Sequence, residues 1–500
     1  MQPVGKKSPQ RKMPKSQEAT IRRTLDIAKE RGHNMQELLK YDISCSSYLF
    51  DDEGMMKSAT KSDLTKELEK YLMTESHKKN PFDTMNTVYL IDVMANVRKI
   101  RANAKETKTF GEFVHSFLTY VQNIAKRASR IDFVFDSYID KTIKDSERQK
   151  RAKTSAIELS KIDRQTPLPI QMETFWASSR NKANLESLIH QDAILYPWNE
   201  CIAEVLVSAF EIMHGKNLKS FKLVDDIVIG IPGLNERVEE ADMRLVIHVL
   251  HAAKEGHKRV TILSQDTDVL IMCLYNWTHL SSHGLEELWV TAGIGDSHRF
   301  IPVHELAVQL GESLCKVLPA VHTLTGCDYT SKFGTKAAAL KASPETFLKD
   351  FGTMEVDIEN TIQLAEKYLV QVKKKGSLCD TTDQLRYFEY HHSKSLDLPP
   401  TSHETRLHIL RSFYVTYQMT KLLTAAQEQI APTLYGFLEI DNLLVPQIGR
   451  NPIPEEFTIK CQCSKCASER CPCRMKHRSC CSFCKCRSDL EGSVCKNPLG

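Results

Sequence analysis

The sequence predicts an α/β protein with a mostly parallel sheet flanked by helices, followed by a helical extension and a small cysteine-rich module. Strand-like and helix-like segments alternate between residues 86 and 345, which is typical of parallel sheets whose connections are helices. Ten of the 16 cysteines lie after position 460, and this clustering favours a metal site over a disulfide framework. No apolar run approaches the roughly 20 residues that span a bilayer, and no signal peptide is recognisable. We therefore expect a nuclear or cytoplasmic protein that is neither secreted nor bound to a membrane.

The chain is expected to fold in several parts, since 500 residues exceed one ordinary domain. Strands are predicted at residues 86–93, 131–135, 222–230, 259–263, 269–274 and 287–291, and helices at about 112–128, 199–214, 237–255 and 303–316. The predicted parts are a basic disordered arm (1–20), a helical region (21–80), the α/β domain (86–345), a helical extension (346–445), a linker (446–460) and the cysteine module (461–497).

The net charge of +4 is unevenly distributed. Residues 1–23 hold seven basic side chains and one acidic, and residues 461–500 hold eight basic and three acidic, so residues 24–460 carry a net charge of −7. Two basic ends therefore flank an acidic body. Such ends are suited to contact with a polyanion.

Acidic side chains recur where the predicted strands end or the following segments begin: Asp92, Asp136, Glu240, Asp242, Asp266, Asp268 and Asp328. Ligands of parallel α/β sheets bind beyond the carboxyl ends of the strands. Each residue alone also fits a turn or a helix cap, but grouped carboxylates repel one another unless a cation neutralises them. Oxygen ligands favour Mg²⁺ or Mn²⁺, and two such ions about 4 Å apart stabilise both oxygens of a phosphodiester displacement.

The order of these motifs resembles the flap endonuclease family of 5′ nucleases, within the wider PIN-like group, over residues 86–345. The similar segments are Ile91-Asp92-Val93-Met94-Ala95, Val134-Phe135-Asp136, Glu240-Ala241-Asp242, Asp266-Thr267-Asp268 and Gly326-Cys327-Asp328-Tyr329. The resemblance implies a PIN-like fold in which the seven carboxylates hold two divalent cations. It also implies that Lys144 and Arg151, seven apart in a basic segment, project towards the scissile phosphate and offset its charge, although a solvated charged helix is the alternative.

The chain also departs from that family. About 85 residues precede the first predicted strand, and the duplex-gripping turn is shortened to Lys332-Phe333-Gly334-Thr335-Lys336. A phosphate contact is expected there through Gly334 and Lys336.

The cysteine tail has the spacing of a zinc module, with candidate ligands Cys461, Cys463, Cys466, Cys471, Cys473, Cys480, Cys484, Cys486 and Cys495. So short a segment needs metal to fold, and nine thiolates can hold three Zn²⁺ ions if three of them are shared. The spacing resembles the tesmin-type CXC domain, which is associated with DNA binding. Cys481 is an extra thiol, and Arg474, Lys476 and Arg478 are candidate phosphate contacts. A redox-active thiol cluster and a protein-interaction zinc module are the alternatives.

Three functions stay open at this point. The first is a divalent-metal-dependent nuclease that hydrolyses phosphodiester bonds in DNA and carries a zinc-binding tether. The second is a catalytically inactive, nuclease-fold DNA-binding or chromatin-associated protein. The third is a protein-interaction adaptor that uses zinc only for folding. DNA is the expected partner, and RNA is the alternative.

Overall fold

The computed structural model describes residues 15–43, 47–73, 86–100, 107–136, 157–199, 202–210, 218–224, 227–231, 234, 241–293, 297–393, 398–423, 430–441, 443–488 and 495–497. None of the helices among these residues combines the length and the apolar character that crossing a membrane requires.

An eight-stranded sheet with the order β5-β4-β3-β2-β1-β6-β7-β8 forms the centre of the α/β domain. Its strands are β1 (Thr87–Asp92), β2 (Ala128–Val134), β3 (Glu204–Phe210), β4 (Leu218–Val224), β5 (Ile227–Gly230), β6 (Arg259–Leu263), β7 (Glu287–Ala292) and β8 (Arg299–Pro302). The five central strands from β3 to β7 pair in parallel, and the edge pairings of β4, β5 and β8 are antiparallel. The prediction of a mostly parallel sheet is confirmed.

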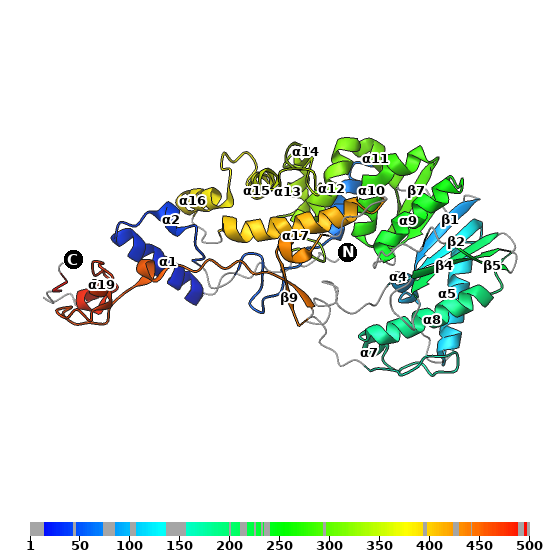
Figure 1. The fold of residues 1–500 in the computed structure, drawn as a ribbon, viewed down its shortest axis with the longest axis horizontal. Helices are drawn as coiled ribbons and strands as arrows, with labels where there is room; N and C mark the ends of the chain where they lie inside the picture. The colour runs from blue at the N-terminus through cyan, green and yellow to red at the C-terminus, as the bar shows by residue number, and fades with distance from the viewer. Residues whose placement is uncertain are drawn as a thin grey trace, which may run out of the picture.

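Helices cover both faces of this sheet (Figure 1). The helices of this domain are α4 (Val93–Val97), α5 (Phe110–Ile124), α7 (Met172–Trp176), α8 (Ser179–Leu195), α9 (Ala241–Lys254), α10 (Thr267–Ser282), α11 (Val303–Leu310), α12 (Glu312–Leu324), α13 (Lys336–Leu340) and α14 (Pro344–Phe347). Because successive strand side chains alternate, Val88 and Leu90 of β1 join the core on the α9–α10 side, whereas Tyr89 and Ile91 join the core on the α5–α8 side.

The chain runs from β1 to β2 on one side of the sheet and later returns to place β6 on the other side of β1. In an open α/β sheet the crevice at such a reversal of strand order is the usual ligand site. Asp92 ends β1 and Asp266 follows β6, so the fold brings two of the candidate carboxylates to this point.

Four predicted elements differ from the structure. The single strand expected at residues 222–230 is divided between β4 and β5, which pair antiparallel, and the helix expected at 303–316 is divided at Gly311 into α11 and α12. Residues 204–210, expected in a helix, form strand β3, in which Val205 and Val207 pack on the α5–α8 side. Residues 269–274, expected as a strand, lie inside α10. That helix contacts α3, α9, α11 and α12, so it is apolar almost all round, and periodicity does not separate such a helix from a buried strand.

A buried polar network ties β2 to α9. Arg130 donates to both carboxylate oxygens of Asp132 at 2.7 and 2.6 Å, and His248 Nδ1 lies 2.7 Å from Asp132 Oδ2. All three side chains are almost completely buried. Since β2 leads to Asp136 and α9 begins beside Asp242, the network fixes the two elements that carry these carboxylates.

The regions before and after this domain are largely helical. Helix α3 packs on α10 and α13 of the domain, and most of the other elements extend away from the sheet (Figure 1). Their elements are α1 (Lys15–Glu30), α2 (Met35–Leu38), α3 (Ser62–Glu69), α15 (Ile358–Lys373), α16 (Thr382–His392), α17 (Ser402–Thr420), the 3₁₀ helix η5 (Pro432–Tyr435), β9 (Phe437–Ile440), β10 (Leu443–Pro446), α18 (Glu455–Thr458), α19 (Pro472–Met475) and α20 (Lys485–Ser488). The β9–β10 hairpin was not predicted.

Candidate metal centres

Asp92 is held at the carboxyl end of β1 by hydrogen bonds to both of its carboxylate oxygens. It caps α4 by accepting from the Ala95 amide at 2.9 Å, and its second oxygen accepts from the Ser264 hydroxyl, just after β6, at 3.0 Å. Burial and, next, the charge of Asp136 raise the pKa of Asp92 to about 6, and Asp266 adds to the rise. The carboxylates at this end of the sheet are therefore close enough to repel one another.

Asp136 lies two residues beyond β2, beside the first turn of α9. Its Oδ1 accepts from the Ala241 amide at 3.3 Å, and Asp242 follows in that first turn with only 8 % of its surface exposed. The structure thus places Asp92, Asp136 and Asp242 at the same edge of the sheet. Glu240, Lys144 and Arg151 lie outside the described residues.

Asp266, Asp268 and Asp328 form a tighter group, in which one carboxylate oxygen from each lies within 4.8 Å of the others. Asp266 caps α10 by accepting from the Asp268 amide at 3.0 Å, while Asp328 comes from the loop after α12. His322 of α12 orients Asp268, because its Nε2 lies 2.7 Å from Asp268 Oδ1. Burial lowers the pKa of His322, as does Lys336, so the neutral imidazole is favoured.

Lys61 reaches into this acidic group from the start of α3. Its ammonium lies 3.1 Å from Asp266, 3.2 Å from Asp268 and 2.8 Å from Asp328. Burial alone would lower the pKa of Lys61, but the three carboxylates outweigh burial and raise it well above its usual range. The residue is therefore a permanent cation among the three aspartates.

Sequence reasoning missed Lys61 entirely. It lies 205 residues from Asp266 along the chain, and the helical region around it shows no motif. Its role depends on where α3 docks, which local sequence patterns do not report.

The donor set of the acidic group fits a hard divalent cation. It consists of carboxylate oxygens, the ligands that Mg²⁺ and Mn²⁺ favour. The pKa of Asp92 is raised first by burial and then by repulsion from Asp136, and a bound cation would relieve that repulsion.

The shortened turn at Gly334 packs against Val372 of α15. Gly334 has a φ of +61°, and a Cβ there would lie 2.6 Å from Val372 Cγ1, so the position requires glycine for conformation and for space. The Lys336 ammonium donates to the carbonyls of His322 and Gly326 and to the Thr325 hydroxyl at 2.7–3.0 Å.

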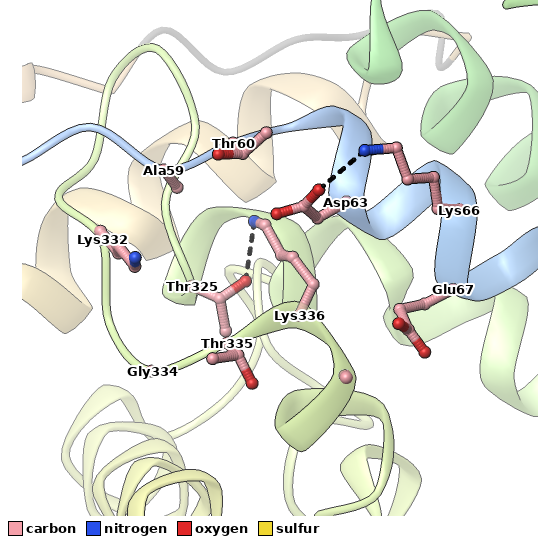
Figure 2. A pocket seen from close by; sticks show the side chains of 11 residues that line it. Ala59, Thr60, Asp63, Lys66, Glu67, Thr325, Lys332, Gly334, Thr335 and Lys336 are labelled. Atoms are coloured by element: carbon pink, nitrogen blue, oxygen red, sulfur yellow. Dashed lines mark hydrogen bonds and ion pairs between the residues drawn. The ribbon is translucent and has the colours of Figure 1, made fainter. Parts of the chain in front are cut away.

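Figure 2 shows Lys336 directed towards Thr325. Both residues line a small polar pocket of about 180 Å³ between α3 and α13. Of the two predicted phosphate contacts, Gly334 lines this pocket but Lys336 is buried and its three donors are satisfied internally. The basic side chain on the rim of this turn is Lys332, which is exposed.

The tail cysteines form one cluster of sulfurs with Cys461 at its centre. Cys461 Sγ lies 3.4 Å from Cys466, 3.8 Å from Cys480 and 3.7 Å from Cys486. Zinc–sulfur bonds of about 2.3 Å at tetrahedral angles place sulfurs about 3.8 Å apart, whereas a disulfide needs about 2.05 Å. The spacing therefore matches thiolates arranged around metal ions.

Three groups of four thiols could each hold an ion, and all three contain Cys461: Cys461, Cys471, Cys473 and Cys480; Cys461, Cys466, Cys480 and Cys486; and Cys461, Cys463, Cys466 and Cys471. Burial raises the pKa of Cys471, but backbone and thiol hydrogen bonds more than offset this and lower the pKa to about 7. The tail can thus hold metal with shared thiolates.

The remaining tail cysteines also belong to this cluster. Cys484 lies 3.7 Å from Cys473, and Cys495 packs against the cluster. The extra Cys481 is buried, with its sulfur 3.7 Å from Cys484. Around the thiols, Lys476 is exposed, and Arg474 and Arg478 are half-buried.

Helix α1 docks on the cysteine cluster (Figure 1). Arg31, just beyond the helix, donates to the Ser479 carbonyl at 3.2 Å and to Cys473 Sγ at 3.5 Å. The Glu30 carboxylate accepts from the amide and the hydroxyl of Ser482 at 2.7–2.9 Å. The N-terminal region therefore contacts both candidate metal centres.

No family model matches this sequence, and no curated protein matches it significantly.

Proposed function

We propose that this protein is a divalent-metal-dependent nuclease that hydrolyses phosphodiester bonds in DNA and is tethered to nucleic acid by its zinc-binding tail. One observation carries the proposal: carboxylates from β1, β2, the β6–α10 turn and the loop after α12 converge at the strand-order reversal of a parallel sheet. Their order along the chain resembles the PIN-like, flap-endonuclease type of nuclease.

The residues that would hold the metal are Asp92, Asp136, Asp242, Asp266, Asp268 and Asp328. A divalent cation bound there would activate water and stabilise charge on the phosphate oxygens. The chain's own contribution is positioning, since capping bonds fix Asp92 and Asp266 and His322 fixes Asp268. Preorganised groups of this kind need little rearrangement during the reaction.

The tail supports the tethering part of the proposal through its spacing and charge. The thiol geometry fits zinc, and the segment resembles the tesmin-type CXC domain. Lys476, Lys485 and Arg487 are exposed between the thiols, where they can contact phosphates.

Cleavage of 5′-flapped DNA in Mg²⁺ or Mn²⁺ tests the proposal, with the wild type compared with Asp136→Asn. The matched control is Asp350→Asn, which changes an exposed aspartate in the same way. We expect Asp136→Asn to lower the cleavage rate by about 100-fold or more and the control to leave it unchanged. Equal rates in all three proteins would refute the assignment.

A second candidate, a non-catalytic DNA-binding protein with a nuclease fold, is favoured by the ammonium of Lys61 among three of the carboxylates. It predicts salt-dependent affinity for DNA but no metal-dependent product from the wild type. The same cleavage reactions, run beside a binding titration at two salt concentrations, separate the two candidates.

A further inference from the structure

The acidic centre already contains one positive charge of its own. Lys61 Nζ lies 2.8–3.2 Å from oxygens of Asp266, Asp268 and Asp328, the same three residues whose oxygens are close enough to share an ion. Its side chain is only 16 % exposed. An ion bound by all three carboxylates would need the space that this ammonium fills.

Lys61 is fixed by the docking of α3. Leu64 and Leu68 of that helix are fully buried in the core on the α9–α10 side. The hydroxyl of Thr65 lies 3.2 Å from that of Thr267 in α10, and Glu69 forms an ion pair with Arg299, the first residue of β8. The backbone that carries Lys61 is therefore part of the folded domain.

The other half of the centre is different. Asp92 at the end of β1 lies opposite Val134 of β2, and Asp136 follows two residues beyond Val134, so the two carboxylates leave the same end of the sheet. Their charges repel each other, and among the described residues neither forms an ion pair with a lysine or arginine. Lys99 donates to Asn96 Oδ1 at 2.8 Å and interacts with Asp92 through its charge. Arg244 interacts with Asp136 through its charge. This half carries negative charge that a divalent cation can neutralise.

We infer that Lys61 is a built-in cation that occupies one cation position of the acidic centre, so that the centre takes a single divalent ion, at Asp92 and Asp136. The inference rests on the metal centre of the proposed function. It revises the two ions implied by the family resemblance to one, and it assigns Asp266, Asp268 and Asp328 to Lys61 rather than to the metal. Lys61 supplies the second positive charge, and the N-terminal region thereby becomes part of the centre.

Counting bound Mn²⁺ by electron paramagnetic resonance on the full-length, zinc-loaded protein tests this inference. We expect one Mn²⁺ per chain in the wild type and two in Lys61→Met, which keeps most of the side-chain volume but frees the three carboxylates. Lys66→Met, on the same helix with an exposed ion pair, is the matched control and should bind one. Two ions in the wild type, or one in Lys61→Met, would overturn the inference.

A second pair of variants keeps the test decisive if Lys61→Met does not fold. Asp328 is one-third exposed, and it pairs with Lys61 rather than with the metal. Asp328→Asn should therefore change Mn²⁺ affinity by less than about 2-fold, whereas Asp136→Asn should weaken it by more than the roughly 10-fold typical of an outer-shell partner. Equal weakening by both variants would show that the triad holds the ion.

The readouts separate this inference from the proposed function. One bound ion without cleavage would refute the nuclease and leave the role of Lys61 intact. Cleavage by a protein that binds two ions would support the nuclease and refute the role of Lys61 as a built-in cation.

Discussion

Replacing Asp132 with asparagine should destabilise the protein more than any surface change, because it leaves a buried arginine without its counter-charge. Arg130 and Asp132 are both 0 % exposed, and the carboxylate accepts two bonds from the guanidinium and one contact from His248. An asparagine at position 132 would keep one acceptor oxygen, but its amide N–H group would face a donor of Arg130 or His248. Breaking a buried pair in this way costs about 3–5 kcal/mol.

A domain of this size shifts its Tm by about 2–4 °C per kcal/mol, so differential scanning calorimetry should show Asp132→Asn melting at least about 6 °C below the wild type. Glu286→Gln is the matched control, because it removes a carboxylate from an exposed pair with Lys258, and such pairs contribute about 0–1 kcal/mol.

The double variant Arg130→Met/Asp132→Asn removes the buried charge as well, so it should melt above the single variant. If the losses in Tm of the single variants Arg130→Met and Asp132→Asn simply add in the double variant, or if Asp132→Asn melts at the same temperature as the control, the charge-pair reasoning is wrong.

Two further predictions concern pH and zinc. Burial and the charge of Arg411 lower the pKa of His408 to about 3, so the unfolded chain binds a proton more readily below pH 6.5 and the unfolding free energy falls as pH drops from 6.5 towards 3. This histidine contributes a slope of about 1.4 kcal/mol per pH unit, and urea unfolding of His408→Gln between pH 7 and 5 should show a flatter dependence; identical slopes would contradict this assignment. Because Cys461 belongs to all three thiol groups, Cys461→Ser should retain fewer zinc ions per chain than the wild type, as measured by elemental analysis. The control Cys379→Ser, which lies outside the tail, should retain all of them. Full retention in both variants would show that Cys461 is not shared between ions.

The sheet was predictable where a strand was short, apolar and followed by a polar turn. β1 and β6 meet these conditions, and the carboxylates that end them, Asp92 and Asp266, were found for the same reason. The prediction failed for β3, because the sequence around its valines also fits a helix. Its strand conformation depends on pairing with β2. Tertiary pairing decided the outcome there, as it commonly does for short segments.

Of the candidate site, only the metal-ligand residues could be predicted from the sequence. Aspartates at strand ends are visible in a sequence, because the strand and the turn are both local. Lys61 and Lys336 show what is not visible. The first reaches three aspartates from a region without a motif, and the second, expected on the surface, is buried because three oxygens converge on its ammonium. The direction of the Lys61 side chain depends on contacts about 200 residues away in the sequence, and that of Lys336 depends on how the loop after α12 folds back on the end of that helix.

The N-terminal region provides a basic side chain to each anionic centre. Nine thiolates around three Zn²⁺ ions would carry a net charge of about −3, and Arg31 donates to one of those sulfurs. The aspartates at the sheet edge are likewise anionic, and Lys61 lies among three of them. A buried or half-buried anion is stabilised by a cation held at hydrogen-bonding distance, so each centre gains from the docking of its N-terminal helix. The described residues before β1 are therefore best regarded as part of both centres, and the net charge of either centre depends on a residue that its own ligand motif does not contain.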